Sequence, residues 1–363
     1  MQVCPKCNSS SIQKRGTGTG KQRLSCNDCS SWFSVSLTSN SETPRGYIIK
    51  GQSTLYDQDG NVKLTWEKVD RNQSQQFEMA KEAIKKLSEE IPKVKPQEFT
   101  GECKSELAVV IPFGDPHIGL YTWSEEVGED YTLAKAKDLF IQAMQQSVYQ
   151  APNADRCYII NVGDFFHADN MENKTGRSGN ALDVDGRYQQ ILKVGIQIFR
   201  SWINTCLDKY PEVHIINAVG NHDDHSSQWL NIALQSMYDN EPRVIVKDNA
   251  NKYIYEQFGK VLFGVTHGDG AKMADLGEIM ANDVPSKWGE SRYRYWYTGH
   301  LHHEQIKEFR GVRCETFRTI AKGDSWHHAS GYRSDRDVKV IVLHKSFGEV
   351  QRLTLNIEQF NIE

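Results

Sequence analysis

The sequence contains no apolar run long enough to cross a membrane. None of its apolar stretches approaches the ~20 residues that a spanning helix requires. Its first residues, MQVCPKC, lack the apolar core of a signal peptide, and no P-loop pattern for binding ATP phosphates is present. We therefore expect a cytoplasmic protein in a reducing environment, with no ATP-driven step carried out by this chain.

The composition is that of a globular protein with an uneven charge. The 363 residues suffice for a main domain and a smaller module, and 25% charged with 10% aromatic residues argue against disorder. The net charge is −4, but residues 1–50 carry +5, which leaves −9 for the rest. A basic head predicts an anionic partner such as nucleic acid, although a solvated surface has the same pattern.

Four cysteines near the N-terminus have the spacing of a structural zinc site. CPKC and CNDC are two C-x2-C knuckles separated by 18 residues, and each places two thiolates on one tight turn. We predict a zinc ribbon over residues 1–36 that needs one structural Zn²⁺ to fold. Unrelated thiols or two disulfides are weaker alternatives. The ligands would be Cys4, Cys7, Cys26 and Cys29, whereas Cys103, Cys157, Cys206 and Cys314 are expected in the core.

The ribbon resembles the zinc ribbons at the N-termini of some insertion-sequence transposition proteins. The resemblance covers about the first 35 residues and rests on the C-P-x-C knuckle, a glycine-rich turn and the segment KQRLSCNDCSSWF. It implies contact with DNA. Protein docking or formation of a homodimer through the ribbon is the alternative. The phosphate-binding residues would be Lys14, Arg15, Lys21 and Arg23.

Residues 37–100 offer no side chains arranged for chemistry. A polar linker over 36–45 precedes a β-hairpin over 47–69, in which a D-G-N turn separates two strand-like segments. A helix is predicted over 74–90 from its apolar spacing, and Pro92 and Pro96 follow it. We interpret the region as a spacer or docking subdomain.

The remaining residues, 101–363, alternate short apolar segments with helical ones. This order predicts an α/β domain in which buried strands lead into loops. Helices are expected over 133–149 and 187–207, from apolar residues at helical spacing. Strands are expected over 107–114, 156–163, 213–220, 260–268 and 294–300.

Side chains that bind metals follow five of these strands. Eight of the twelve histidines lie in the five loops. Because sites in open α/β sheets form at the carboxyl ends of strands, we expect these loops to meet. One such histidine could be structural, but five clusters predict a metal site. The loops hold Asp115 and His117; Asp164 and His167; Asn221, His222, Asp223 and His225; His267; and His300, His302 and His303.

The order of the motifs resembles the calcineurin-like metallophosphoesterase superfamily. D-x-H, G-D, G-N-H-D, an isolated histidine and G-H-x-H follow one another between about residues 105 and 345. The resemblance implies two packed mixed β-sheets flanked by helices, with two metal ions at one edge. Asp115, His117 and His302 would hold one ion, Asn221, His267 and His300 the other, and Asp164 would bridge them.

The mixed donor set narrows the choice of metal. Imidazole, carboxylate and amide ligands suit Mn²⁺, with Fe, Zn²⁺ or Mg²⁺ as alternatives, better than Ca²⁺, which prefers oxygen ligands only. Two adjacent ions can lower the pKa of a shared water and bind both oxygens of an in-line displacement at phosphorus. By the same resemblance, His222 would act as general acid and Asp223 would orient its ring.

The second motif favours a nuclease. GDFFHADN resembles the corresponding segment of the nuclease subunit in double-strand-break repair complexes, which implies that His167 approaches the scissile phosphate. A phosphoesterase fused to a small ribbon also resembles stand-alone enzymes of tailed phages and prophages. We therefore predict a two-metal DNA phosphodiesterase, either an exonuclease or a structure-selective nuclease. The alternatives are a small-nucleotide phosphodiesterase, a phosphoprotein phosphatase, and an adaptor with a dead site.

Basic and aromatic residues are interleaved around and after the last motif. Residues 291–340 contain ten Lys and Arg against six Asp and Glu, a mixture that can follow a phosphate backbone and stack on bases. Tyr295, Trp296 and Tyr297 are better explained as a core strand. Arg318 and Lys322 are predicted to contact nucleic acid from a substrate-facing loop.

Overall fold

The computed structural model falls into two compact units, Met1–Ala83 and Ile84–Glu363. It describes residues 3–18, 21–36, 47–57, 62–71, 94–175, 179–248, 251–323, 331 and 333–360. The helix predicted over 74–90, most of the predicted linker and the D-G-N turn lie outside these residues. Among the helices that are described, none is both long and apolar enough for a membrane span.

The first unit contains two small antiparallel sheets. β1 (Ile12–Gly18), β2 (Lys21–Cys26) and β3 (Trp32–Ser36) form a three-stranded sheet in chain order. β4 (Tyr47–Tyr56) and β5 (Val62–Arg71) pair antiparallel from Tyr47↔Arg71 to Tyr56↔Val62, with a register shift near each end. The predicted hairpin is therefore confirmed.

The second unit is built around a six-stranded mixed sheet. Four of its strands, β6 to β9, run parallel to one another. β15 pairs antiparallel with β6, and β16 pairs antiparallel with β15 at the edge. The order is β16 (Gly348–Asn356), β15 (Asp337–His344), β6 (Leu107–Phe113), β7 (Arg156–Asn161), β8 (Glu212–Asn217) and β9 (Val244–Val246).

A five-stranded mixed sheet packs against the first. Its order is β10 (Ile254–Phe258), β11 (Val261–Val265), β12 (Tyr293–Thr298), β14 (Val312–Thr316) and β13 (Gln305–Phe309). β11, β12 and β14 run parallel. Tyr295, Trp296 and Tyr297 are buried in β12, which confirms the core strand. All five predicted strands of the body are confirmed.

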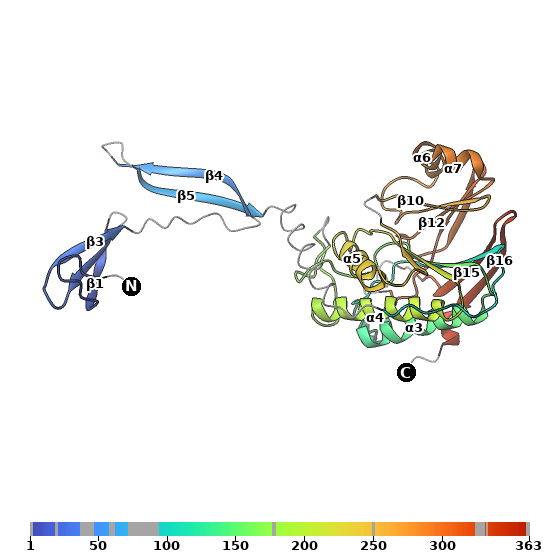
Figure 1. Ribbon diagram of the computed structural model, residues 1–363, viewed down its shortest axis with the longest axis horizontal. Coiled ribbons are helices and arrows are strands. Elements are labelled where there is room, and N and C mark those ends of the chain that lie inside the picture. The colour runs from blue at the N-terminus through green and yellow to red at the C-terminus, as the bar shows by residue number, and fades with distance from the viewer. Residues whose placement is uncertain are drawn as a thin grey trace. The chain divides into compact units, whose positions relative to one another are not determined.

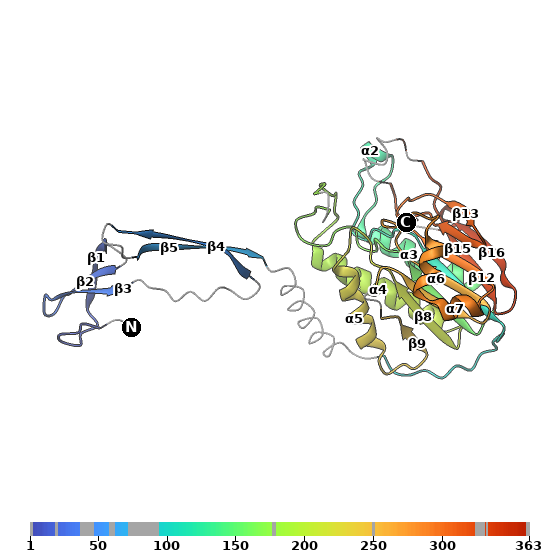
Figure 2. The same cartoon turned by 90° about the horizontal axis from the view of Figure 1, so that it is seen from above.

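Helices cover the outer faces of both sheets. α3 (Leu133–Gln150), α4 (Tyr188–Leu207) and α5 (Ser226–Tyr238) pack on the six-stranded sheet, and α6 (Leu276–Asp283) and α7 (Pro285–Glu290) cover the five-stranded one. Figure 1 shows the two groups on opposite sides of the sheets, and Figure 2 shows α5 beside β9. The predicted fold, two packed mixed sheets flanked by helices, is confirmed.

Alternation along the strands creates two apolar layers. In β6, Val109 and Ile111 face the helices, whereas Ala108 and Val110 face the second sheet, as the period of two in a strand requires. Trp202 of α4 anchors the helical layer, because its ring stacks on Phe113 with centroids 4.1 Å apart. A sheet buried on both faces has its functional groups at the strand ends.

The cysteines outside the ribbon divide in their environment. Cys157, Cys206 and Cys314 are buried, as expected for core thiols, but Cys103 is exposed. The prediction for Cys103 was wrong because residue 103 precedes β6 and lies outside the buried strands of the sheet.

Candidate functional site

Five loops from both sheets meet at one edge of the second unit. β6, β7 and β8 are parallel neighbours, so the loops that follow them open on the same side. β11 and β12 are parallel neighbours in the other sheet and contribute two more loops. These are the loops that carry the predicted ligands.

The backbone at these positions is strained. Nine described residues other than glycine have a positive φ, and five of them are predicted ligands: Asp115, His117, Asp164, His300 and His302, with φ between 42° and 70°. Such a conformation costs on the order of 1–3 kcal/mol per residue and persists only where the surroundings impose it. The strained backbone directs the side chains of these five residues toward one another.

Two glycines allow the loops to approach closely. A Cβ added at Gly220 would lie 2.0 Å from Oδ1 of Asp164, and one added at Gly299 would lie 2.7 Å from Oδ2 of Asp115. Both distances are far below a van der Waals contact, so a larger residue would displace a predicted ligand. Glycine is therefore required for steric reasons at the first position of both the G-N-H-D and the G-H-x-H motif.

The first cluster consists of Asp115, His117 and His302. Their candidate ligand atoms lie within 4.8 Å of one another. The Nε2 atoms of His117 and His302 are 3.1 Å apart, and Nε2 of His302 lies 3.7 Å from Oδ1 of Asp115. The Asp115 carboxylate accepts hydrogen bonds from the backbone N of His300, and its backbone O accepts one from Oγ1 of Thr319.

The second cluster consists of Asp164, His267 and His300, with Asn221 beside it. Nε2 of His267 lies 3.2 Å from Oδ2 of Asp164, 3.3 Å from Nδ1 of His300 and 3.0 Å from Oδ1 of Asn221. Nδ1 of His267 donates to the backbone O of Val162, at 3.1 Å. That bond fixes the ring so that Nε2 faces the cluster, as is usual for histidines that bind metals.

Burial and charge set the protonation of the two clusters. Burial opposes ionisation of Asp164, but the positive charge of His267 outweighs it and lowers the pKa of Asp164. Burial lowers the pKa of His267, but Asp164 more than compensates and raises it to about 10. Burial, together with His222 and His302, lowers the pKa of His117 well below its usual value. Without a metal, a proton on His267 compensates the buried Asp164 charge.

These clusters fit divalent metal ions. Imidazole nitrogens 3.1–3.3 Å apart converge on shared points together with buried carboxylates, which is what a coordinating cation requires. The donors are nitrogen and oxygen atoms in mixed sets, suited to transition metals. All seven predicted ligands lie in or beside the two clusters. Oδ1 of Asp164 accepts from the backbone N of His222, and its bridging role stays a prediction.

His222 and His167 lie beside the first cluster. The ring of His222 is 4.9 Å from that of His117 between centroids, and Nδ1 of His167 is 3.3 Å from Nδ1 of His117. Nδ1 of His222 is 3.0 Å from the backbone O of His167. Because a carbonyl oxygen only accepts, Nδ1 of His222 carries hydrogen, and Nε2 is the atom left for a substrate.

Asp223 does not orient His222, which corrects the expectation. Its buried carboxylate accepts hydrogen bonds from the backbone N of Gly220 and of Phe166, at 3.0 and 3.2 Å. It therefore joins the third loop to the second. The His222 ring is oriented instead by the backbone carbonyl of His167, a contact that no side-chain motif indicates.

Asp169 holds two of the site loops together, and the sequence prediction missed this role. Its carboxylate accepts from the backbone N and ring of His225 and from the backbone N and Oγ of Ser226 at the start of α5. It thus ties the loop after β7 to the loop after β8. The only signal was its place in GDFFHADN, within a motif interpreted for other residues.

Three of the cations predicted to contact nucleic acid, Arg318, Lys322 and Arg15, have protein partners. Arg318 pairs with Asp337 and lies 3.8 Å from Glu304, and Lys322 is 2.9 Å from Glu129. In the ribbon, Arg15 donates to Oγ of Ser25 and lies 6.0 Å above the exposed Trp32 ring. Lys14 and Arg23 are exposed, and the side chain of Lys21 lies outside the described part. Their contact with nucleic acid remains a prediction.

The ribbon cysteines form a compact cluster with two equivalent halves. Sγ of Cys4 is 3.6 Å from that of Cys29, and the same distance separates Cys7 from Cys26. Zn–S bonds of about 2.3 Å in a tetrahedron place sulfurs about 3.8 Å apart, so the cluster fits zinc. In each knuckle the backbone N of the first cysteine donates to the backbone O five residues later. The backbone O of the same cysteine accepts from the backbone N four residues later.

Comparisons with known proteins give a weak likeness. No protein-family model and no curated protein matches the chain. Among solved structures, the phosphoesterase YfcE from E. coli is 14% identical, with 68% of this chain and 100% of that chain covered and a TM-score of 0.32. Vps29 with Zn²⁺ from Entamoeba histolytica is 11% identical, with 69% and 99% covered and a TM-score of 0.28.

A third solved structure is similar over more of this chain. The sulfate thiohydrolase SoxB from Thermus thermophilus is 9% identical, with 73% of this chain and 59% of that chain covered and a TM-score of 0.35. All three TM-scores are below 0.5, so no activity is transferred from these proteins. The function proposed below rests on the side chains of this chain.

Proposed function

We propose that the chain is a two-metal phosphodiesterase that hydrolyses nucleic acid. The observation that carries the proposal is the pair of adjacent His/Asp clusters with His222 and His167 beside the first. Asp115, His117 and His302 would hold one divalent ion, and Asn221, His267 and His300 the other, with Asp164 between them. When bound, the ions would supply Lewis acidity to a phosphoryl group and activate water.

The residues around the clusters divide the remaining tasks. His222 holds its Nδ1 hydrogen against the His167 carbonyl, so its Nε2 can deliver a proton to the leaving oxygen as general acid. The His167 ring contacts His117 on the same side and supports a position for the scissile phosphate. The backbone O of Val162 fixes the His267 ring, and the Asp115 carboxylate holds the backbone of His300, before substrate arrives.

Charge supports nucleic acid as the substrate. The first 50 residues carry +5 on an otherwise acidic chain, and the exposed Lys14 and Arg23 share the ribbon with Arg15 and Trp32. Cations attract phosphate backbones, and an exposed indole offers a stacking surface for a base. The resemblance of GDFFHADN to repair nucleases supports DNA, cleaved as an exonuclease or a structure-selective nuclease.

Labelled DNA provides the direct test. The purified protein is incubated with single- and double-stranded DNA in the presence of Mn²⁺, Zn²⁺, Mg²⁺ or none, beside an Asp164→Ala variant. We expect metal-dependent cleavage by the wild type and a loss of at least about 100-fold in the variant. Metal analysis of the same samples should find more metal than the ribbon alone can bind.

Two outcomes would overturn this proposal. Absence of cleavage with every metal, together with metal in the ribbon only, would indicate an adaptor. A preference for a nitrophenyl phosphate monoester over the corresponding diester would indicate a phosphatase, since a nuclease must act on a diester.

A further inference from the structure

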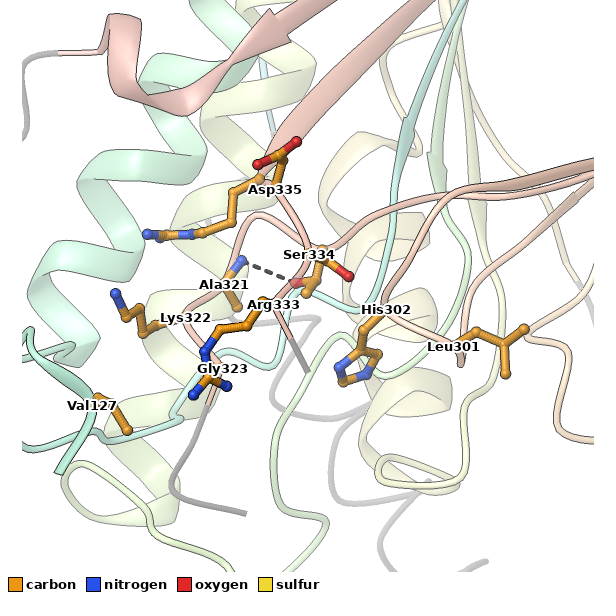
Figure 3. A pocket seen from close by; sticks show the side chains of 11 residues that line it. Val127, Leu301, His302, Ala321, Lys322, Gly323, Arg333, Ser334 and Asp335 are labelled. Atoms are coloured by element: carbon orange, nitrogen blue, oxygen red, sulfur yellow. Dashed lines mark hydrogen bonds between the residues drawn. The ribbon is translucent and has the colours of Figure 1, made fainter. Parts of the chain in front are cut away.

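A pocket of about 250 Å³ opens beside the first metal cluster. His302 lines it, so the pocket begins at a predicted metal ligand (Figure 3). Its other walls come from Val127 at the end of α2 (Ser124–Val127), from residues 319–323 and from residues 333–336. This volume is below the about 300–1,000 Å³ of sites for whole small molecules, so the space suits a group no larger than a sugar with its phosphate.

The lining is cationic. Among the described residues that line the pocket, Lys322, Arg333 and Arg336 are cations and Asp335 is the carboxylate. Figure 3 shows Lys322 and Arg333 near one another, with His302 across the pocket from Lys322. Three cations around so small a space match a phosphate, because charge-assisted hydrogen bonds to phosphate are among the strongest that side chains form.

Protein contacts hold Lys322 and Arg336 in place. Nζ of Lys322 lies 2.9 Å from Oε2 of Glu129, and Nη1 of Arg336 lies 3.7 Å from the same oxygen. Nε of Arg336 donates to the backbone O of Ile320. One carboxylate therefore serves two cations, which leaves net positive charge at the pocket wall while fixing the cations before a ligand arrives.

The floor of the pocket is coupled to the metal cluster. Thr319 lines the pocket, and its Oγ1 donates to the backbone O of Asp115 while accepting from the backbone N of Ala321. Leu301, which lies between the two histidines of G-H-x-H, adds an apolar wall. A group in the pocket would thus sit next to a phosphate held at the metals.

We infer that this pocket binds the phosphate next to the scissile one along a nucleic-acid strand. The inference rests on the proposed function and narrows its substrate, because a strand with a neighbouring phosphate would be preferred to an isolated diester. Arg333 and Lys322 would contact that phosphate, and Val127 and Leu301 would border its sugar. Arg336 would act as a positioning residue.

Dinucleotides with and without a neighbouring phosphate test the inference. kcat/KM is measured with Mn²⁺ for TpT, pTpT and TpTp, whose single internal diester is the same. We expect the wild type to hydrolyse one phosphorylated form at least about 10-fold better than TpT. Arg333→Ala and Lys322→Met should each reduce this ratio about 3-fold, and the double variant should bring it close to one.

Binding supplies a second measurement that does not depend on turnover. A fluorescent oligothymidylate is titrated into Asp164→Ala protein at several salt concentrations, with and without Arg333→Ala. Removing one phosphate contact from a single strand should reduce the slope of log K against log salt by about 0.7. A merely structural effect would weaken binding without changing the slope.

Lys345→Met is the matched control, because Lys345 also pairs with a glutamate, 2.6 Å from Oε1 of Glu106, away from the pocket. It should leave the ratio and the salt slope as in the wild type. Equal hydrolysis of TpT and both phosphorylated forms by an active wild type, or ratios unchanged in the pocket variants, would overturn the inference alone. Absence of cleavage of every diester would overturn the proposed function and the inference with it.

Discussion

Positive φ angles are concentrated at the ligand positions of the second unit. Of the seven predicted ligands, five adopt them, and they lie in three of the five loops. Asp and His accept this conformation more readily than β-branched residues, which is consistent with their use here. The strained backbone at these positions serves to bring the ligand side chains together.

The two adjacent histidines of G-H-x-H-H should differ sharply in function. His302 lies 3.1 Å from His117 within the first cluster, whereas the ring of His303 contacts the backbone O of Leu301. We expect His302→Gln to reduce metal-dependent hydrolysis at least about 100-fold and to abolish the rise in melting temperature on adding Mn²⁺. His303→Gln should retain both, and equal losses in the two variants would contradict the assignment of the cluster.

The role of His222 can be read from leaving groups. If Nε2 of His222 delivers the proton, His222→Gln should reduce kcat about 10²- to 10⁴-fold for a dinucleotide, whose sugar alkoxide needs that proton. The loss should be much smaller for a nitrophenyl diester, since a nitrophenolate leaves without protonation. Equal losses on the two substrates would show that His222 only positions the phosphate.

At the scale of elements, Asp169 caps α5 and pairs with His225. The hydrogen bond from the His225 ring to Asp169 raises the pKa of His225 above its usual value. The pair therefore stabilises the fold fully below about pH 6.5 and loses this contribution as the pH rises through the raised pKa. Because His225 is half exposed, the effect should stay under about 1 kcal/mol.

Denaturation of two variants measures the two contributions separately. His225→Gln should lower the free energy of unfolding more at pH 5.5 than at pH 8.5. Asp169→Ala should cost about 1–2 kcal/mol at both pH values, because the helix cap is lost as well. A His225→Gln effect that grows with pH would contradict the sign of the pKa shift.

A buried ion pair joins β16 of the six-stranded sheet to β14 of the five-stranded sheet. Nη2 of Arg352 in β16 lies 2.8 Å from Oε2 of Glu315 in β14, and Glu315 is 1% exposed. Arg352→Met would leave a buried carboxylate without this partner and should cost about 3–5 kcal/mol in the free energy of unfolding. Glu315→Leu combined with Arg352→Met should recover much of the loss, and no recovery would indicate that Arg313 or Glu349 carries the network.

At the scale of the whole molecule, the ribbon and the body should unfold separately. The chain divides into two compact units, and the ribbon has the four cysteines as its main core. Cys26→Ser should therefore remove the ribbon's zinc and its ordered structure, while the main calorimetric transition of the body keeps its midpoint. Cys103→Ser, at an exposed thiol, is the matched control, and a lowered body transition in Cys26→Ser alone would show that the units fold together.

The fold and the metal clusters could be predicted because they depend on side chains that the sequence shows directly. Apolar alternation identified the strands, and the histidines at strand ends identified the clusters. Contacts made by the backbone could not be predicted, which is why the His167 carbonyl was missed and Asp223 was assigned to His222. The partners of Arg318 and Lys322 depend on distant segments, Asp337 and Glu129, that no local pattern connects.

Each metal cluster draws its ligands from both sheets. In the first, Asp115 and His117 follow a strand of the six-stranded sheet and His302 follows one of the five-stranded sheet; in the second, Asp164 faces His267 and His300 in the same way. A bound ion would be a cross-link at the open end of the apolar seam between the sheets. Metal binding and packing of the two sheets at that edge would then occur together. The affinity for metal would therefore report on how stably the two sheets pack.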